Sequence, residues 1–179
     1  MGDHILFFYG TLMAPQVLHR VIHGRGEPEP WQKAMLRFQP AVLLGYRRHR
    51  VRGADYPGIV PASEATTRTS VRGTLVSGLT DGDVHRLDMY EGDEYTRDPV
   101  TVRVLGESVP GGSKSNLEAH LKDVLDSAGP DLKAEGVEVQ AKTYVWVAGE
   151  GRLEDAEWDF ETFKKDKMAW WVNADESQW

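Results

Sequence analysis

The sequence predicts an α+β domain built on a small, mostly antiparallel β-barrel with flanking helices. Short segments typical of strands, either fully apolar or alternating, are mixed along the chain with amphipathic helical patterns, and this mixed order favours an α+β fold. No repeat is found at any period, which argues against a solenoid or a propeller. At 179 residues the chain has the usual size of one domain. We therefore expect a single domain over residues 1–179, although periodicity alone does not show that the sheet closes.

The first strand and the helix after it have clear signals. Residues 5–8 are consecutively apolar and precede Gly10, which suits a strand buried on both faces. Pro15 is placed to begin a helix with one apolar face, and Gly24 ends it. We expect residues 26–40, which carry Pro28, Pro30 and Pro40, to form an irregular connection.

Five later segments read as strands, and a second helix lies among them. Thr80 caps this helix, which has Val84 and Leu87 on the same side and ends at Gly92. The last two strands alternate between apolar and polar residues, and we expect them to pair antiparallel. The five expected strands are residues 41–46, 58–60, 71–76, 99–105 and 139–147.

Two segments do not belong to this pattern. An insertion at about residues 106–137 begins with glycine and serine and continues with a helical stripe of leucine and valine, which predicts a flexible flap or arm. The segment at about residues 155–172 is rich in tryptophan and phenylalanine. It is too apolar for a free tail, and we expect a helix that closes the core.

Composition excludes several classes of function. The chain has no cysteine, so a disulfide scaffold, a thiolate nucleophile and a sulfur-ligated metal are all ruled out. A net charge of −7 predicts no nucleic-acid partner, because phosphate contacts need clustered Lys and Arg. The one basic run, residues 47–52, could touch an anion, but it is more typical of a solvated strand face. The first residues have no basic region ahead of their short apolar run, and no apolar stretch approaches the length that spans a bilayer. We therefore expect a cytoplasmic protein, and its oligomeric state stays open.

Two minor patterns suggest other chemistry. His19 and His23 are one helical turn apart and could bind zinc, but no third ligand is evident. The stretch at residues 113–115, Ser-Lys-Ser, lies in a Gly-rich setting that lacks the rigidity of a nucleophilic site. We expect neither a metal nor a cofactor.

Two stronger candidates lie at element ends. Gly10 lets the backbone turn sharply after the first strand, so that amides around Thr11 and Leu12 can point at a carboxylate or an oxyanion. Glu91 ends the second helix beside a glycine. Taken alone, each is more typical of an ordinary turn or a solvated helix end, and the acids at 88, 93 and 94 compete with Glu91.

An ordered set of short motifs changes this balance. The motifs are residues 9–12 (YGTL), 56–58 (YPG), 71–75 (VRGTL), 87–92 (LDMYEG) and 94–97 (EYTR). Each is weak alone, but in this order they resemble the gamma-glutamylcyclotransferase-like family, and most closely its branch named after plant avirulence-induced proteins. The resemblance covers residues 4–105 well and residues 142–146 and 158–160 less firmly.

This resemblance implies both a fold and a reaction. The fold is a small barrel with a cavity at one mouth, and the reaction cyclises a gamma-glutamyl compound to 5-oxoproline with release of an amine or amino acid. By the match, Glu91 is the catalytic acid/base and the loop of Tyr9, Gly10, Thr11 and Leu12 holds the glutamyl group. Because the substrate's own amine attacks, no protein nucleophile is needed.

The remaining motif residues have less certain roles. Tyr9 and Tyr95 are expected to line the pocket, although an aromatic residue at a strand end is more often core. Glu94 is the chief rival of Glu91, and we expect it at the surface. Arg97 could meet a substrate carboxylate, but pairing with a nearby acid is the simpler expectation.

Three interpretations stay open at this level. One is catalysis by Glu91, and another is a protein of the same fold that binds a small molecule or a partner without turning it over. In the third, the insertion at residues 106–137 is an interaction arm. The leaving group of the substrate cannot be read from the sequence.

Overall fold

The computed structural model describes residues 2–13, 15–24, 31, 35–54, 56–61, 70–104, 109–110 and 137–154. The strands are β1 (His4–Phe8), β2 (Arg37–Leu44), β3 (Tyr46–Arg50), β4 (Pro57–Pro61), β5 (Ser70–Leu79), β6 (Tyr95–Val104), β7 (Val109–Pro110) and β8 (Glu138–Trp146). The helices are α1 (Pro15–His23) and α3 (Asp81–Glu91), with short 3₁₀ turns η1 (Thr11–Met13), η3 (Gly92–Glu94) and η4 (Glu150–Arg152).

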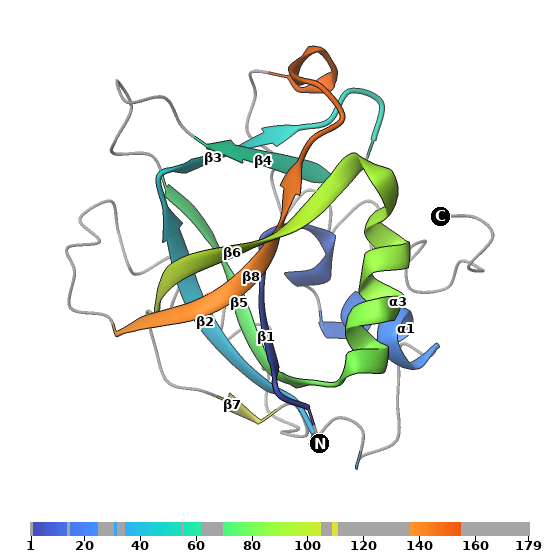
Figure 1. Ribbon diagram of the computed structural model, residues 1–179, viewed down its shortest axis with the longest axis vertical. Coiled ribbons are helices and arrows are strands. Elements are labelled where there is room, and N and C mark those ends of the chain that lie inside the picture. The colour runs from blue at the N-terminus through green and yellow to red at the C-terminus, as the bar shows by residue number, and fades with distance from the viewer. Residues whose placement is uncertain are drawn as a thin grey trace.

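Five strands form a closed barrel. Their hydrogen-bonded order is β5-β1-β8-β6-β2, and a further pairing of β2 with β5 closes the ring. Only the β1–β8 contact is parallel among these pairs, whereas the others are antiparallel. Figure 1 shows this ring with α1 and α3 together on one side and the β3–β4 hairpin across one end. The predicted barrel is therefore confirmed, as is the antiparallel pairing of β6 with β8.

The consecutive apolar residues of β1 contribute to two hydrophobic clusters, one on each face of the strand. Phe7 is buried in a cluster of strand residues, including Leu43, Val102 and Ala141, together with Tyr9 just after β1. Phe8 points the other way, into a larger cluster that includes residues of both helices. Because successive strand residues face opposite sides of a sheet, the apolar run seen in the sequence reports a strand buried on both faces.

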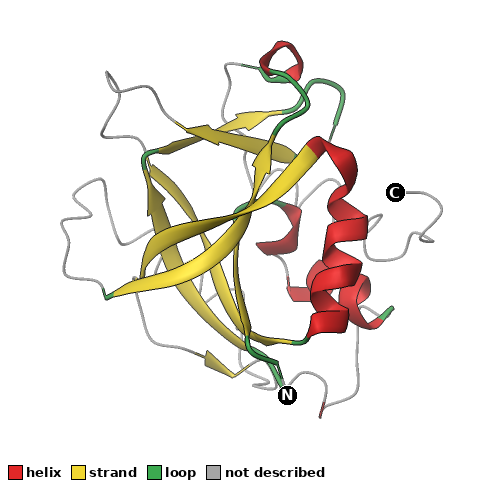
Figure 2. Cartoon of the chain, in the orientation of Figure 1, coloured by secondary structure: helices red, strands yellow, loops and turns green. Residues whose placement is uncertain are grey.

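The two helices pack against the outside of the barrel, as Figure 2 shows in red. Thr80 caps α3 by accepting from the Asp83 amide while the Asp83 carboxylate accepts from the Thr80 amide. At the other end Gly92 has φ 68° and its N–H donates to the Asp88 carbonyl. The helix therefore begins and ends as predicted. No described helix has the length and apolar character to span a bilayer.

The irregular connection predicted for residues 26–40 is wrong at its end, since β2 begins at Arg37 and includes Pro40. A proline lacks the N–H that a strand uses for pairing. Pro40 pairs with Thr74 of β5, whereas on its other side β2 pairs with β7 at Arg37 and with β6 from Ala41 on. The proline thus falls at a break in the neighbouring ladder, where a missing donor costs little.

The predicted second strand, residues 41–46, also ends too late. Gly45 has φ 83°, which separates β2 from β3, and Tyr46 belongs to β3. Two residues of the predicted insertion form β7, which pairs with β2. The rest of that insertion and the closing helix expected at residues 155–172 lie outside the described residues.

Gly73 is a position in the barrel that has no room for a side chain. A Cβ there would lie 2.2 Å from the Phe8 carbonyl oxygen and 2.7 Å from the Phe7 ring. We predict that Gly73→Ala lowers the free energy of unfolding by about 3 kcal/mol, because the clash is with backbone and a core ring. Urea denaturation measures this change.

Gly82 provides the matched control. Its Cβ would meet nothing closer than the Thr80 hydroxyl at 3.8 Å, so Gly82→Ala in α3 should be neutral or stabilising by up to about 1 kcal/mol. Equal losses in the two variants would contradict this account of the barrel.

Candidate functional site

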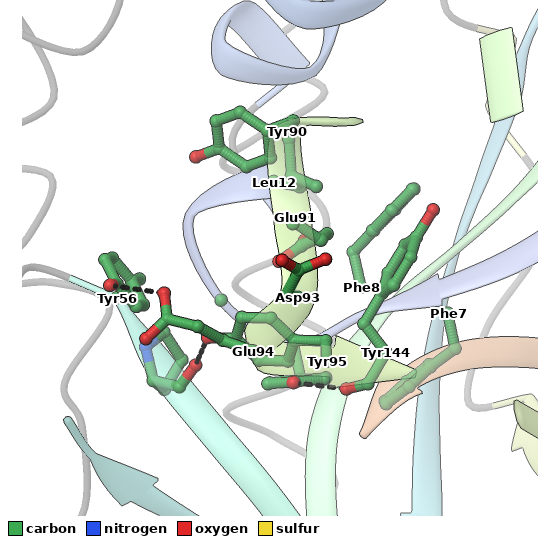
Figure 3. Close-up of a pocket in the computed structure, with 14 residues that line it drawn as sticks. Phe7, Phe8, Leu12, Tyr56, Tyr90, Glu91, Asp93, Glu94, Tyr95 and Tyr144 are labelled. Carbon is green, nitrogen blue, oxygen red and sulfur yellow. Dashed lines mark hydrogen bonds between the residues drawn. The ribbon is translucent and has the colours of Figure 1, made fainter. Parts of the chain in front are cut away.

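A cavity of about 300 Å³ opens between the end of β1, the start of β4 and the end of α3. This volume is at the small end of the usual range for ligand pockets. Its wall is mainly aromatic, and three acids line it, namely Glu91, Asp93 and Glu94. In the view of Figure 3, Glu91 lies between Tyr56 on one side and Phe8 and Tyr144 on the other.

The first loop enters this cavity through a close contact at Gly10. A Cβ on Gly10 would lie 2.7 Å from the Pro57 ring, so only glycine lets the loop pass so near β4. The loop then turns into η1, where the Met13 amide donates to the Gly10 carbonyl at 3.0 Å. Gly10 and Leu12 both line the cavity.

Pro57 is the point where several of the sequence motifs meet. The Tyr95 hydroxyl donates to the Pro57 carbonyl at 2.7 Å. Next to it, a Cβ on Gly58 would lie 3.0 Å from Trp146. Motifs that are far apart in the sequence are thus one packed group behind the cavity.

The loop is also held from the basic run of β3. The Arg48 guanidinium donates to the Tyr9 carbonyl at 2.8 Å, and 3.4 Å separates it from the Arg72 carbonyl. Arg47 and Arg50 are exposed, but Arg48 is half-buried. The prediction of a solvated basic face is therefore wrong for Arg48, because its partners are backbone oxygens of neighbouring strand ends.

Glu91 faces the cavity from the last residue of α3. Burial raises the pKa of its carboxyl to about 8, and the nearby carboxylates of Glu94 and Asp88 add to the rise. The residue remains partly exposed, so a ligand can reach it. Across the described ranges, no hydrogen bond or ion pair engages this carboxyl.

Glu94 and Asp88, the two acids that add to this rise in pKa, do have hydrogen-bond and ion-pair partners. Glu94 accepts from the Tyr56 hydroxyl at 3.1 Å and from Arg152 at 2.6 Å. The expectation that Glu94 is a surface residue is therefore incomplete: it lines the cavity, and both of its carboxylate oxygens have partners. Asp88 forms an ion pair with Arg97 at 2.5 Å, as the sequence predicted for that arginine.

Four tyrosine hydroxyls around the cavity are donors with fixed partners. Tyr9 donates to the Tyr144 carbonyl, and Tyr144 in turn donates to Asp88 at 2.8 Å. Burial raises the pKa of Tyr9, Tyr95 and Tyr144 above the ordinary value, and burial also raises that of Tyr56. These hydroxyls therefore stay protonated at neutral pH and are committed to the protein.

This arrangement matches a known family. Residues 6–160 match the family described as gamma-glutamyl cyclotransferase, AIG2-like. The chain belongs to this family. Among curated proteins, Protein AIG2 C of Arabidopsis thaliana is 27% identical over 162 residues, which span 90% of this chain and 73% of that protein.

Solved structures with a similar fold support the fold described above. The solution structure of an Arabidopsis thaliana protein has a TM-score of 0.55 and 24% identity and covers 92% of this chain and 83% of its own. A structure described as a gamma-glutamyl cyclotransferase has a TM-score of 0.51 and 13% identity, with 84% of this chain and 68% of that chain covered. Both similarities show the fold alone.

The residues expected from the family motifs come together. Tyr9, Gly10, Leu12, Glu91 and Tyr95 all line the cavity. Tyr9 and Tyr95 are buried as well, so each is at once a core residue and part of the wall. Thr11 lies in η1, the turn that adjoins them, and its side chain lies outside the described part of the structure.

Three contributors were missed as site residues. Tyr144 reads as an ordinary strand aromatic, and Arg48 as part of a solvated basic run, because the partners of both come from distant strands. Tyr56 lies in the YPG motif of residues 56–58, and this motif is the sequence signal that could have identified it. His19 and His23 stack with ring centroids 5.4 Å apart, and in the described residues no group of three or more His, Cys, Asp or Glu forms a metal-binding cluster.

The raised pKa of Glu91 makes stability depend on pH. Between its ordinary value of 4.5 and about 8, the folded protein keeps a proton on Glu91 that the unfolded chain releases, so stability falls as pH rises through this window. We predict that Glu91→Gln, which cannot charge, removes this slope. From pH 5 to pH 8 the variant should gain roughly 2 kcal/mol relative to the parent, since each pKa unit is about 1.4 kcal/mol and water at the cavity mouth reduces the cost.

Chemical denaturation at a series of pH values measures the difference. If the free energy of unfolding changed with pH in the same way for the parent and for Glu91→Gln, the Glu91 carboxyl would ionise freely in the folded protein. The raised pKa described for this site would then be wrong.

Proposed function

We propose that this protein is a cyclotransferase that converts a gamma-glutamyl compound to 5-oxoproline and releases the attached amine or amino acid. The observation that carries the proposal is the Glu91 carboxyl, which lines a cavity with its pKa raised to about 8 and no partner among the described residues. The family to which the chain belongs supports the reaction class.

The reaction needs one group that moves protons in both directions. The substrate's α-amine attacks its own γ-carbonyl, so that a C–N bond closes the five-membered ring and the C–N bond to the leaving amine breaks. The α-amine is an ammonium at neutral pH and must first lose a proton. Ionised Glu91 takes this proton and delivers it to the leaving nitrogen as the C–N bond breaks. The ring nitrogen loses a second proton after the ring closes, and Glu91 passes this proton to the released amine, which leaves as an ammonium ion, so the carboxylate is restored at the end of the cycle.

The pKa of Glu91 suits this exchange. A carboxyl with its ordinary pKa of 4.5 would be too weak a base at neutral pH to take the proton and would rarely hold one to donate, whereas a group with a pKa near the working pH donates and accepts at similar cost. Glu94 and Asp88 do not have this freedom, because their carboxyl oxygens are engaged by Arg152 and Arg97.

The first loop is suited to hold the glutamyl part. The 3₁₀ turn η1 has no internal acceptors for its first amides, so the backbone N–H groups of Thr11 and Leu12 are available to a carboxylate or to the oxyanion of the γ-carbonyl. Leu12 and Tyr95 provide apolar walls that exclude water and favour the folded substrate.

The first experiment is a 5-oxoproline release assay on a panel of gamma-glutamyl amino acids, gamma-glutamyl amines and glutathione. We predict that Glu91→Gln lowers kcat by about a hundred- to ten-thousand-fold with the fold intact, because the amide cannot exchange the proton. Glu138→Gln is the matched control: it makes the same chemical change on β8 at an exposed residue that does not line the cavity, and it should retain parental activity.

Each outcome has a clear meaning. Equal activity of the parent and Glu91→Gln would remove Glu91 from the mechanism. The absence of release from every compound, together with tight binding of one of them, would favour the alternative of a small-molecule binding protein on the same fold.

Gly10→Ala tests the loop separately. The added Cβ meets the Pro57 ring at 2.7 Å and must displace the loop from β4. We predict at least a tenfold rise in KM or fall in kcat in the same assay, because a displacement of about 1 Å can cost on the order of a hundredfold. Parental kinetics in Gly10→Ala would show that the loop does not hold the substrate.

A further inference from the structure

The Asp88 side chain ties the last turn of α3 to the barrel. One carboxylate oxygen accepts from the Tyr144 hydroxyl at 2.8 Å, and the other accepts from Arg97 at 2.5 Å. Arg97 on β6 and Tyr144 on β8 are direct partners across the antiparallel ladder. The two strands therefore present a pair of adjacent donors that matches the two oxygens of one carboxylate.

An acid is unusual in the C-terminal turn of a helix. The C-terminal end of a helix carries a partial negative charge, so acids there are unfavourable and basic residues are preferred. The last turn of α3 has no basic residue, but it carries both Asp88 and Glu91. Arg97 offsets the charge of Asp88, whereas no cation in the described ranges pairs with Glu91.

We propose that Asp88, held by Tyr144 and Arg97, is the positioning residue that fixes the last turn of α3 and so aims Glu91 into the cavity. Asp88 lies three residues before Glu91 on the same helix, and the Gly92 amide that ends the helix donates to the Asp88 carbonyl. The side chain and the backbone of one residue thus fasten the helix end to the barrel and terminate it. This inference rests on the proposed role of Glu91.

The cluster of Asp88, Tyr144 and Arg97 also affects the electrostatic environment of Glu91. Asp88 raises the pKa of Glu91, and Arg97 is the cation that faces Asp88. Several other titratable groups come from the elements packed around the carboxyl. They are Tyr9 after β1, Glu94 in η3, Tyr95 on β6 and Tyr144 on β8, with Asp93 also on the cavity wall.

Two variants of the cluster test its positioning role, with one control. Asp88→Ala removes both ties, whereas Asp88→Asn keeps an oxygen that can accept from Tyr144. Arg103→Gln is the control, because Arg103 also lies on β6 and pairs with an acid on β8, Glu138, at 3.5 Å, but does not line the cavity.

In the 5-oxoproline assay, Asp88→Ala should lose at least tenfold in kcat with KM changed less than threefold, because the substrate still binds but meets a misplaced carboxyl. Asp88→Asn should recover most of this loss, and Arg103→Gln should show none. Equal losses in Asp88→Asn and Asp88→Ala, or a loss confined to KM, would overturn the positioning role.

A second readout needs no substrate. The carboxyl carbon of Glu91 can be titrated by NMR in ¹³C-labelled protein. Arg97→Gln leaves Asp88 without its cation and should raise the pKa of Glu91 by about one unit, whereas Asp88→Asn removes the negative charge and should lower it by a similar amount.

The direction of these shifts separates positioning from a general loss of structure. If the cluster only stabilised the fold, both variants would loosen the helix end, admit water and lower the pKa of Glu91 together, and that result would overturn the inference. Because this titration is independent of turnover, it tests the cluster even if the protein releases no 5-oxoproline, in which case only the proposed function fails.

Discussion

The site depends on one constraint: an acid lies in the wall of the cavity, and no cation in the described residues balances its charge. Removing a carboxylate from water is costly, and proteins usually compensate with an ion pair or hydrogen bonds. Glu94 and Asp88 are compensated in this way by Arg152 and Arg97. Glu91 has no such partner among the described residues, and burial raises its pKa to about 8. A protein that retains an uncompensated acid at a helix end loses stability there, which is expected where the acid has a chemical task.

The barrel makes this arrangement possible by holding the surrounding groups rigidly. Gly10 passes Pro57 with no room for a Cβ, the Tyr95 hydroxyl binds the Pro57 carbonyl, and Arg48 holds the carbonyl of Tyr9. Each of these contacts joins elements that are distant in the sequence. They leave the cavity with walls that cannot easily collapse onto Glu91, and they commit the Tyr95 hydroxyl to a backbone carbonyl.

Much of this could be predicted from the sequence, and the failures have physical causes. The strand at β1, the capped helix α3 and the β6–β8 pair follow local patterns of apolar residues, caps and glycines, and the family motifs pointed to five of the residues that line the cavity, namely Tyr9, Gly10, Leu12, Glu91 and Tyr95. Pro40 was misread because a proline is acceptable in a strand where a neighbouring ladder is interrupted, and that interruption depends on strands far away. Arg48 and Tyr144 were missed for a similar reason, since their partners are backbone or side-chain oxygens brought near only by closure of the barrel.

The central claim is that the α-amine of a gamma-glutamyl group meets residue 91 inside this cavity. A crystal structure of Glu91→Gln with a gamma-glutamyl compound bound tests it most directly, because the variant keeps the shape of the site and does not turn the compound over. The account predicts that the α-amine lies within hydrogen-bond distance of the residue 91 side chain and that the loop at residues 10–12 contacts the glutamyl carboxylate. A compound bound with its α-amine turned away from residue 91, or bound outside the cavity, would contradict it.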